Sequence, residues 1–477
     1  MNRTTKKQAT NILAVVFLFF FIYAIKFTFL PVSTAKIVVG IGIISIALLL
    51  VKKQFVMPFS WKALRPSLLI LILGIYSICI SLLNKSGDYN VPYAYLLFIV
   101  EHILGSLIFV ELFAKKEMFT RDWFFKCLIA TCTIQAIIIL MMLFSPALRY
   151  SIINITNPSL LDLNIRYGGI RGLGLAVSTT YDLSLLQSMG IILVIYLLPK
   201  SKKDSQLVGY AAITLVLLVS VLLSGRTGYI GLFFAALFLI WQVVQDKNAR
   251  QATLKYILYF IIIILIVALV FSLFAPAELF YTITVDANIY VFEMFYNLFG
   301  ISPQYAEWLQ NHQVNKDSRV FNIFISRVPI WGNESSPNKD NDVEQYHGLT
   351  TDSTEVLKKM YFNMPLKTWL IGDGYYLNKN GDGYYMSTDA GYMRHILYYG
   401  LAGSLLLATF YIWIFVRMIK SALQQKNASL TLLLSMFFLL IFCVHLKGDI
   451  LLGSGMIIKV ILLLYFVIYR VNESCPK

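Results

Sequence analysis

Uninterrupted apolar segments recur along this chain, and they restrict it to folds that cross a lipid bilayer. Residues 11–30 and 256–276 are two such segments, and at 1.5 Å per residue each can cross ~30 Å of hydrocarbon as a helix. A helix on the surface of a soluble protein would show a polar stripe every 3.6 residues, which these segments do not. The pattern predicts an all-α polytopic membrane protein.

Twelve segments of this kind predict about twelve transmembrane helices. We expect the first to be a retained span, because it is longer than the apolar region of a signal peptide and no small-residue cleavage site follows it. The predicted spans are residues 11–30, 36–51, 67–83, 95–113, 124–144, 182–199, 207–223, 228–245, 256–276, 390–416, 429–446 and 450–469.

The net charge of +15 has a membrane explanation. Lys and Arg cluster in alternate loops, for example Lys52 and Lys53, or Lys200, Lys202 and Lys203, whereas the loops between them hold almost none. The positive-inside rule then places both termini in the cytoplasm. The same rule accounts for much of the basic charge, so no nucleic-acid partner is expected; the lipid bilayer is the expected surrounding.

Two of the predicted outer loops are long. Residues 145–181 form one, and residues 277–389 form a second that is polar and rich in Tyr and Asn. The chain therefore divides into helices 1–9 in residues 1–276, a large outer loop in 277–389, and helices 10–12 in 390–477.

Three arginines fall at the predicted outer face. Arg171 lies before the sixth span among glycines, Arg226 lies in the short turn between spans seven and eight, and Arg394 begins the tenth span beside His395. A guanidinium offers a fixed fork of donors that fits phosphate oxygens, so the three predict a site for a lipid-linked pyrophosphate. The alternative is that each arginine extends to the lipid headgroups.

The other notable polar residues do not indicate a specific function. Glu101 and His102 lie inside the fourth span, where an ionisable pair serves either a proton relay or a bond to a neighbouring helix. Lys459 near a span end is expected to reach the interface or pair with another helix. The five cysteines have no metal-site spacing, so we expect no metal and no other cofactor.

Three short motifs occur in the order found in one bacterial family. They are Arg171 in RGLGLAVSTTYD, the turn Ser224–Gly228 (SGRTG), and LIGDG (Leu370–Gly374) followed by TDAGYMRHILYYGLAGSL at residues 388–405. With a large outer loop before the last motif, the chain resembles bacterial O-antigen polymerases, within the O-antigen ligase and polysaccharide polymerase superfamily. It departs from the ligases at Asp389, where they carry a histidine.

The resemblance implies a GT-C-like, metal-independent glycosyltransferase in the bacterial cell inner membrane with a periplasmic loop. It would join undecaprenyl-pyrophosphate-linked repeat units in O-antigen and lipopolysaccharide biosynthesis, or make a related polysaccharide, and a chain-length regulator is a further candidate partner. Asp389 would be the first candidate base and His395 the second, with Arg171 and Arg226 stabilising the leaving diphosphate. Expected substrate-binding residues are Arg171, Arg226, Arg394, Tyr392, Tyr384 and Tyr385.

Alternatives to this function and to these roles stay open on the sequence alone. The tyrosines could stack on sugar rings or form an interfacial aromatic belt. An O-antigen ligase would differ in its acceptor, and the residue at position 389 weighs against it. A lipid-linked oligosaccharide flippase or other transporter would have short, even loops, unlike this chain.

Overall fold

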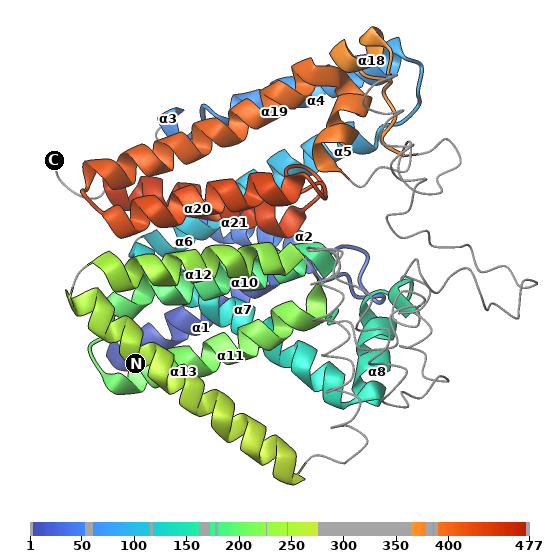
Figure 1. Ribbon diagram of the computed structural model, residues 1–477. Helices are drawn as coiled ribbons and strands as arrows, with labels where there is room; N and C mark the ends of the chain where they lie inside the picture. The colour runs from blue at the N-terminus through green and yellow to red at the C-terminus, as the bar shows by residue number, and fades with distance from the viewer. Residues whose placement is uncertain are drawn as a thin grey trace, which may run out of the picture. The chain divides into compact units, whose positions relative to one another are not determined.

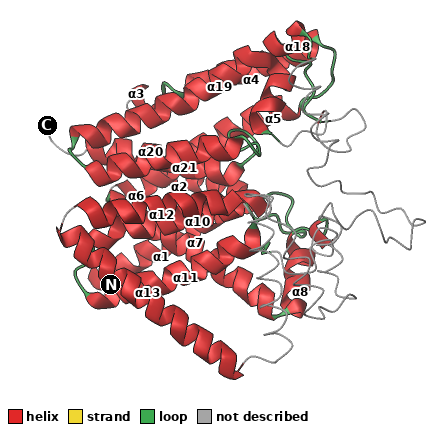
Figure 2. Ribbon diagram, in the orientation of Figure 1, coloured by secondary structure: helices red, strands yellow, loops and turns green. Residues whose placement is uncertain are grey.

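The described residues of this computed structural model form an all-helical membrane protein (Figures 1 and 2). Among them, ten helices are long and apolar enough to cross a membrane, and two shorter apolar helices, Lys7–Tyr23 and Ser67–Leu83, coincide with the first and third predicted spans. The described residues are 3–52, 61–114, 118–161, 172–176, 180–225, 227–245, 247–274, 364–377, 385 and 390–473.

The helices of these residues are connected mostly by short loops. In chain order they are α1 (Arg3–Tyr23), α2 (Thr34–Val51), α3 (Trp61–Leu64), α4 (Ser67–Leu83), α5 (Asn90–Leu97), the π-helix η1 (Phe98–Ile103), α6 (Leu104–Ala114), α7 (Arg121–Phe144), α8 (Pro146–Thr156), α10 (Thr180–Leu197), the 3₁₀ turn η2 (Leu198–Lys200), α11 (Asp204–Ser224), α12 (Thr227–Gln245), α13 (Lys247–Phe274), α18 (Leu366–Leu370), α19 (Gly391–Gln424), α20 (Ala428–His445) and α21 (Gly455–Glu473).

Two compact units divide the chain. The first comprises Met1–Leu163, Ile170–Phe260 and Pro365–Lys477, and it contains the candidate site. The second comprises Asn164–Gly169 and Ile261–Met364, of which the described part is the end of α13 and residue 364. Most of the predicted large loop, residues 277–389, therefore lies outside the described residues.

Local sequence explains where several helices begin. Thr120 caps α7 by accepting the backbone N–H of Trp123 at 3.2 Å. Ser145 caps α8 by accepting the N–H of Leu148 at 3.3 Å, with Pro146 in the first helical position. Such caps satisfy N–H groups that have no partner inside the helix. The α8 helix was not predicted, because its 11 residues lie in a segment that we expected to be a loop.

The first predicted span is shorter than expected. Helix α1 ends at Tyr23 rather than near residue 30. Ala24 has a φ of +47°, and the chain then turns so that the Thr28 N–H donates to the Ile155 carbonyl at 2.7 Å. Hydrophobicity alone did not reveal this end, because residues 24–30 are largely apolar, like the helix before them.

Helix α10 lies at the centre of this unit. It contacts α7, α11, α12, α20 and α21, and most of its length is buried inside the protein. Its buried polar residues include Ser184, Gln187 and Ser188. Helices at the lipid boundary, such as α2, instead expose large apolar side chains, among them Ile41 and Ile44. The polar residues of α10 therefore face protein.

The basic loops meet at one end of this unit. Lys200 pairs with Asp122 at 2.6 Å, Lys255 pairs with Asp204 at 3.0 Å, and Arg417 donates to the Lys62 carbonyl at 2.6 Å. At the opposite end of the helices, Tyr376 joins two loops. Its backbone N–H donates to Asp88, and its hydroxyl donates to Asp449. Alternate loops are thus sorted as predicted; which side of the membrane each faces stays a prediction.

A kink in α19 packs against the LIGDG motif. The helix is interrupted at Tyr399 and Gly400, where Gly400 has a φ of +69°. The carbonyls of Leu397 and Tyr398 there accept the N–H groups of Asp373 and Gly374 at 2.7 and 2.9 Å. A Cβ on Gly400 would lie 2.2 Å from the Leu370 carbonyl oxygen, so this close backbone approach requires glycine.

The polar residues of the fourth span form a bond between helices. Lys459 on α21 lies 2.6 Å from Glu101 on η1, and both side chains are buried. His102 Nδ1 lies 3.9 Å from the same carboxylate. Of the two roles considered for Glu101, the structure shows the bond to a neighbouring helix, and Lys459 is a helix-pairing residue.

Candidate functional site

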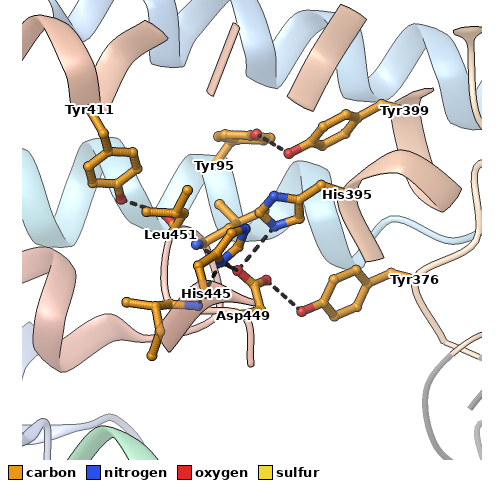
Figure 3. Close-up of polar contacts among 10 residues, drawn as sticks. Tyr95, Tyr376, His395, Tyr399, Tyr411, His445, Asp449 and Leu451 are labelled. Carbon is orange, nitrogen blue, oxygen red and sulfur yellow. Dashed lines mark hydrogen bonds and ion pairs between the residues drawn. The ribbon is translucent and has the colours of Figure 1, made fainter. Parts of the chain in front are cut away.

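A buried carboxylate organises the end of the last three helices that lies opposite the basic loops. Asp449 lies in the turn between α20 and α21 and has no exposed surface. Its Oδ1 accepts the backbone N–H of Leu452 at 3.0 Å, and its Oδ2 accepts the hydroxyl of Tyr376 at 2.8 Å (Figure 3). Tyr376 follows the LIGDG motif, so the motif and the final turn meet at this carboxylate.

Two buried histidines from different helices face Asp449 (Figure 3). His395 Nε2, from the start of α19, lies 3.1 Å from Asp449 Oδ1, and His445 Nδ1, from the end of α20, lies 3.9 Å from the same oxygen. The centres of the two imidazole rings are 5.0 Å apart. Gly391 makes room for them, because a Cβ there would lie 2.5 Å from the His445 ring.

The two histidines keep Asp449 ionised despite its burial. Burial alone would raise its pKa, but the neighbouring imidazoles of His395 and His445 and the Tyr376 hydroxyl outweigh that effect and hold the pKa below its usual range. Burial and the adjacent carboxylate raise the pKa of Tyr376, which stays a neutral donor. The cluster therefore combines a carboxylate, two imidazoles and a phenol.

Arg394 places a cation beside this cluster. It is 5% exposed, and its guanidinium lies 5.9 Å from the centre of the Tyr376 ring. This is the outer limit of a cation–π contact. A buried guanidinium next to a carboxylate and imidazoles can bind an anionic substrate and also leave a proton acceptor within reach.

A second group of contacts involves described residues next to the positions of the other two predicted arginines. Gly172 donates its N–H to the Leu223 carbonyl at 2.8 Å, and Ser184 is hydrogen-bonded to Thr227 at 3.0 Å. Gln135, with its amide turned so that its oxygen accepts, binds the backbone N–H groups of residues 175 and 176 at 3.0 and 3.2 Å. The described residues next to position 171 therefore contact those just before position 226.

Helices α12 and α20 connect the two groups. A Cβ on Gly231 would lie 1.9 Å from Ser188 Oγ and 3.8 Å from a methyl of Leu440. Thr227 lies one helical turn before Gly231, and His445 lies just over one turn after Leu440. The hydrogen bond between Ser184 and Thr227 and the histidine cluster are therefore at the same end of neighbouring helices.

Four of the predicted site residues lie outside the described residues: Arg171, Arg226, Tyr384 and Asp389. Among the others, His395 and Arg394 belong to the buried cluster. Tyr392 is half-buried in the first turn of α19. Tyr385 donates to Asp373 at 3.3 Å and stacks on Tyr375 with ring centres 5.3 Å apart, and whether it stacks on sugars or belongs to an interfacial belt stays a prediction.

His445 and Asp449 had no role predicted from the sequence, and Tyr376 was expected only as one of the loop tyrosines that stack on sugar rings or form an interfacial belt. His445 and Asp449 are four residues apart and follow an apolar span, a spacing that could have drawn attention to them. His395 lies 50 residues earlier, so only the fold brings it to them. The ligand atoms of His395, His445 and Asp449 all lie within 4.8 Å of one another, a separation that can hold a metal ion.

Comparisons with known proteins identify no family for the chain. No protein-family model matches it, and a search of curated proteins finds no match.

Proposed function

We propose that this protein is a polysaccharide polymerase, a glycosyltransferase that joins lipid-diphosphate-linked repeat units. The donor would be a glycan on undecaprenyl pyrophosphate and the acceptor a hydroxyl of another lipid-linked unit, at the periplasmic face of the bacterial inner membrane. The product would be O-antigen or a related surface polysaccharide. The resemblance of its three motifs to O-antigen polymerases supports this proposal, as does the geometry around Arg394.

The observation that carries the proposal is the pairing of a buried cation with a buried proton-accepting cluster. Arg394 adjoins Tyr376, whose hydroxyl binds the carboxylate beside His395. A diphosphate leaving group gains negative charge as the glycosidic bond breaks, so a preorganised guanidinium stabilises the transition state more than the ground state. The attacking hydroxyl must also lose a proton, which requires a nearby base.

Arg171 and Arg226 are proposed to bind the same diphosphate. Support comes from the 2.8 Å hydrogen bond between Gly172 and Leu223, which joins the segments that carry the two arginines. The proton acceptor is Asp389 or His395. A GT-C-like architecture is proposed with the function, from the resemblance and the many apolar helices.

Gene deletion with complementation tests this function. Without the protein, the cell's lipopolysaccharide should carry one repeat unit instead of a ladder, and the wild-type gene should restore the ladder. Arg171→Ala and Arg226→Ala should give single repeats at normal expression. Arg171→Lys should also fail, because lysine lacks the bidentate fork.

Other results of this experiment would contradict the proposed polymerase or its diphosphate site. Loss of every repeat upon deletion would indicate a ligase or a flippase and would overturn the proposed polymerase. Arg417→Ala is a matched control, because that arginine lies among the basic loops and donates to the Lys62 carbonyl. Its ladder should be normal. A normal ladder from both Arg171→Ala and Arg226→Ala would remove the diphosphate site.

A further inference from the structure

We propose that His395, His445 and Asp449 bind one divalent transition-metal cation. Two imidazoles and one carboxylate form a ligand set that suits zinc and related ions, whereas magnesium and calcium prefer oxygen ligands. The three side chains come from α19, α20 and the turn before α21 (Figure 3). This inference differs from our sequence-based expectation of no metal, and it rests on the geometry of the cluster rather than on the proposed reaction.

The arrangement of the donor atoms favours a shared ligand over a simple bond between the side chains. His395 Nε2 lies 3.1 Å from Asp449 Oδ1, yet this buried nitrogen makes no hydrogen bond with any described residue. At that distance a ring N–H pointed at the oxygen would form one. The 3.1 Å separation without an aligned N–H is compatible with two ligands of one metal ion.

The dimensions of the cluster suit zinc after a small adjustment. All three ligand atoms lie within 4.8 Å of one another, and a tetrahedral ion with bonds of about 2.0–2.1 Å places its ligands roughly 3.3 Å apart. The His395–Asp449 separation is close to this value. His445 Nδ1 lies 3.9 Å from the same oxygen, roughly 0.6 Å farther than a tetrahedral site requires. To bind the metal, this nitrogen must also exchange the 3.3 Å hydrogen bond that it accepts from the Ile450 N–H.

A metal ion would also balance the charge of the buried carboxylate directly. Asp449 has no exposed surface, and its ion partners among the described residues are the two histidines. A buried carboxylate needs a compensating positive charge. A metal ion would supply that charge and leave both imidazoles neutral, which is the form that coordinates metals.

Neighbouring groups hydrogen-bond to the Asp449 carboxylate, as groups around a metal ion commonly do to its ligands. Tyr376 donates to Asp449 Oδ2 and the Leu452 N–H donates to Oδ1. Such bonds to a ligating group fix its direction and strengthen metal binding. With three protein ligands, a fourth position stays available for water or a substrate oxygen.

A bound metal would also decide between the two candidate bases of the proposed reaction. Coordination through Nε2 would occupy the nitrogen of His395 that faces Asp449. Proton transfer would then fall to Asp389.

The test measures metal binding by the full-length protein in detergent, without reference to activity. The protein is treated with a chelator, exchanged into metal-free buffer and titrated with Zn²⁺ or Mg²⁺, and bound metal is counted by elemental analysis. We expect about one Zn²⁺ per chain and no Mg²⁺ binding. X-ray absorption of the zinc form should show nitrogen and oxygen ligands at about 2.0–2.1 Å.

Variants separate this site from adventitious binding. His445→Ala and Asp449→Asn should each abolish the stoichiometric Zn²⁺, and Tyr376→Phe should weaken affinity about 10-fold. His312→Ala, which removes a histidine of the predicted large loop, is the matched control and should bind like the wild type. If the two cluster variants unfold, Tyr376→Phe still provides the test. No stoichiometric Zn²⁺ in the wild type, or equal affinity in wild type and Tyr376→Phe, would overturn the metal site but not the polymerase.

Discussion

Lys459 Nζ lies 2.6 Å from Glu101 Oε1 within the helix bundle, and this ion pair joins α21 to the π-helical turn η1. The ring of Phe21 lies 5.1 Å from the same ammonium group. In a membrane-spanning region, either charge alone would be expensive to bury. Gly455, at the start of α21, approaches the His102 ring, so the pair lies within the first turns of α21 after the Asp449 loop.

Breaking this pair one residue at a time should destabilise the protein strongly. Glu101→Gln or Lys459→Met leaves the other charge buried without its partner, and each should cost about 3–5 kcal/mol. The double variant should cost much less than the sum of the two, because no uncompensated charge remains. Thermal unfolding in detergent checks this expectation, and additive single effects would contradict it.

The kink of α19 should not tolerate a side chain at residue 400. Gly400→Ala places a Cβ 2.2 Å from the Leu370 carbonyl oxygen at a φ of +69°. We expect a loss of more than about 2 kcal/mol of stability, measured by thermal unfolding. Gly209→Ala is the control, because its Cβ would meet no atom within 4 Å, and in a helix it should stabilise by up to ~1 kcal/mol.

Asp88 should hold the backbone of the loop that carries Tyr376. Its Oδ2 accepts the N–H groups of Tyr376 and Leu377 at 2.7 and 3.0 Å. Asp88→Ala removes both acceptors, so hydrogen exchange at residues 376 and 377 should accelerate in mass spectrometry. Asp122→Ala, at the basic end, should leave that exchange unchanged. Equal protection in wild type and Asp88→Ala would show that other contacts fix this loop.

Arg394 should matter for turnover of the proposed reaction more than for folding. Arg394→Lys keeps the charge but loses the guanidinium fork, so polymer formation by the purified protein should fall by about 10²–10³-fold, as for other donors to a developing anion. Arg417→Lys should retain activity. Near-normal turnover of Arg394→Lys would exclude a specific contact between this side chain and the diphosphate.

The sequence alone determined the helical membrane architecture. Hydrophobic length is a local property, so the apolar segments could be located without knowing their partners, and ten long and two shorter apolar helices lie where spans were expected. Local hydrophobicity missed the end of α1 at Tyr23, since the apolar stretch continues beyond it. LIGDG was predicted as a motif, but only the fold shows why position 372 is a glycine: a Cβ there would lie 2.4 Å from the Tyr398 carbonyl oxygen at the kink.

The tertiary structure decided which polar residues meet. Glu101 and Lys459 are 358 positions apart in the numbering (459 − 101), and each alone could have faced a headgroup, a cavity or another helix. His395 was predicted as the second candidate base, and only the fold shows that it lies against Asp449 and His445. Such pairings depend on how separate helices pack, because any charge buried in a bilayer must find its partner wherever the packing brings one.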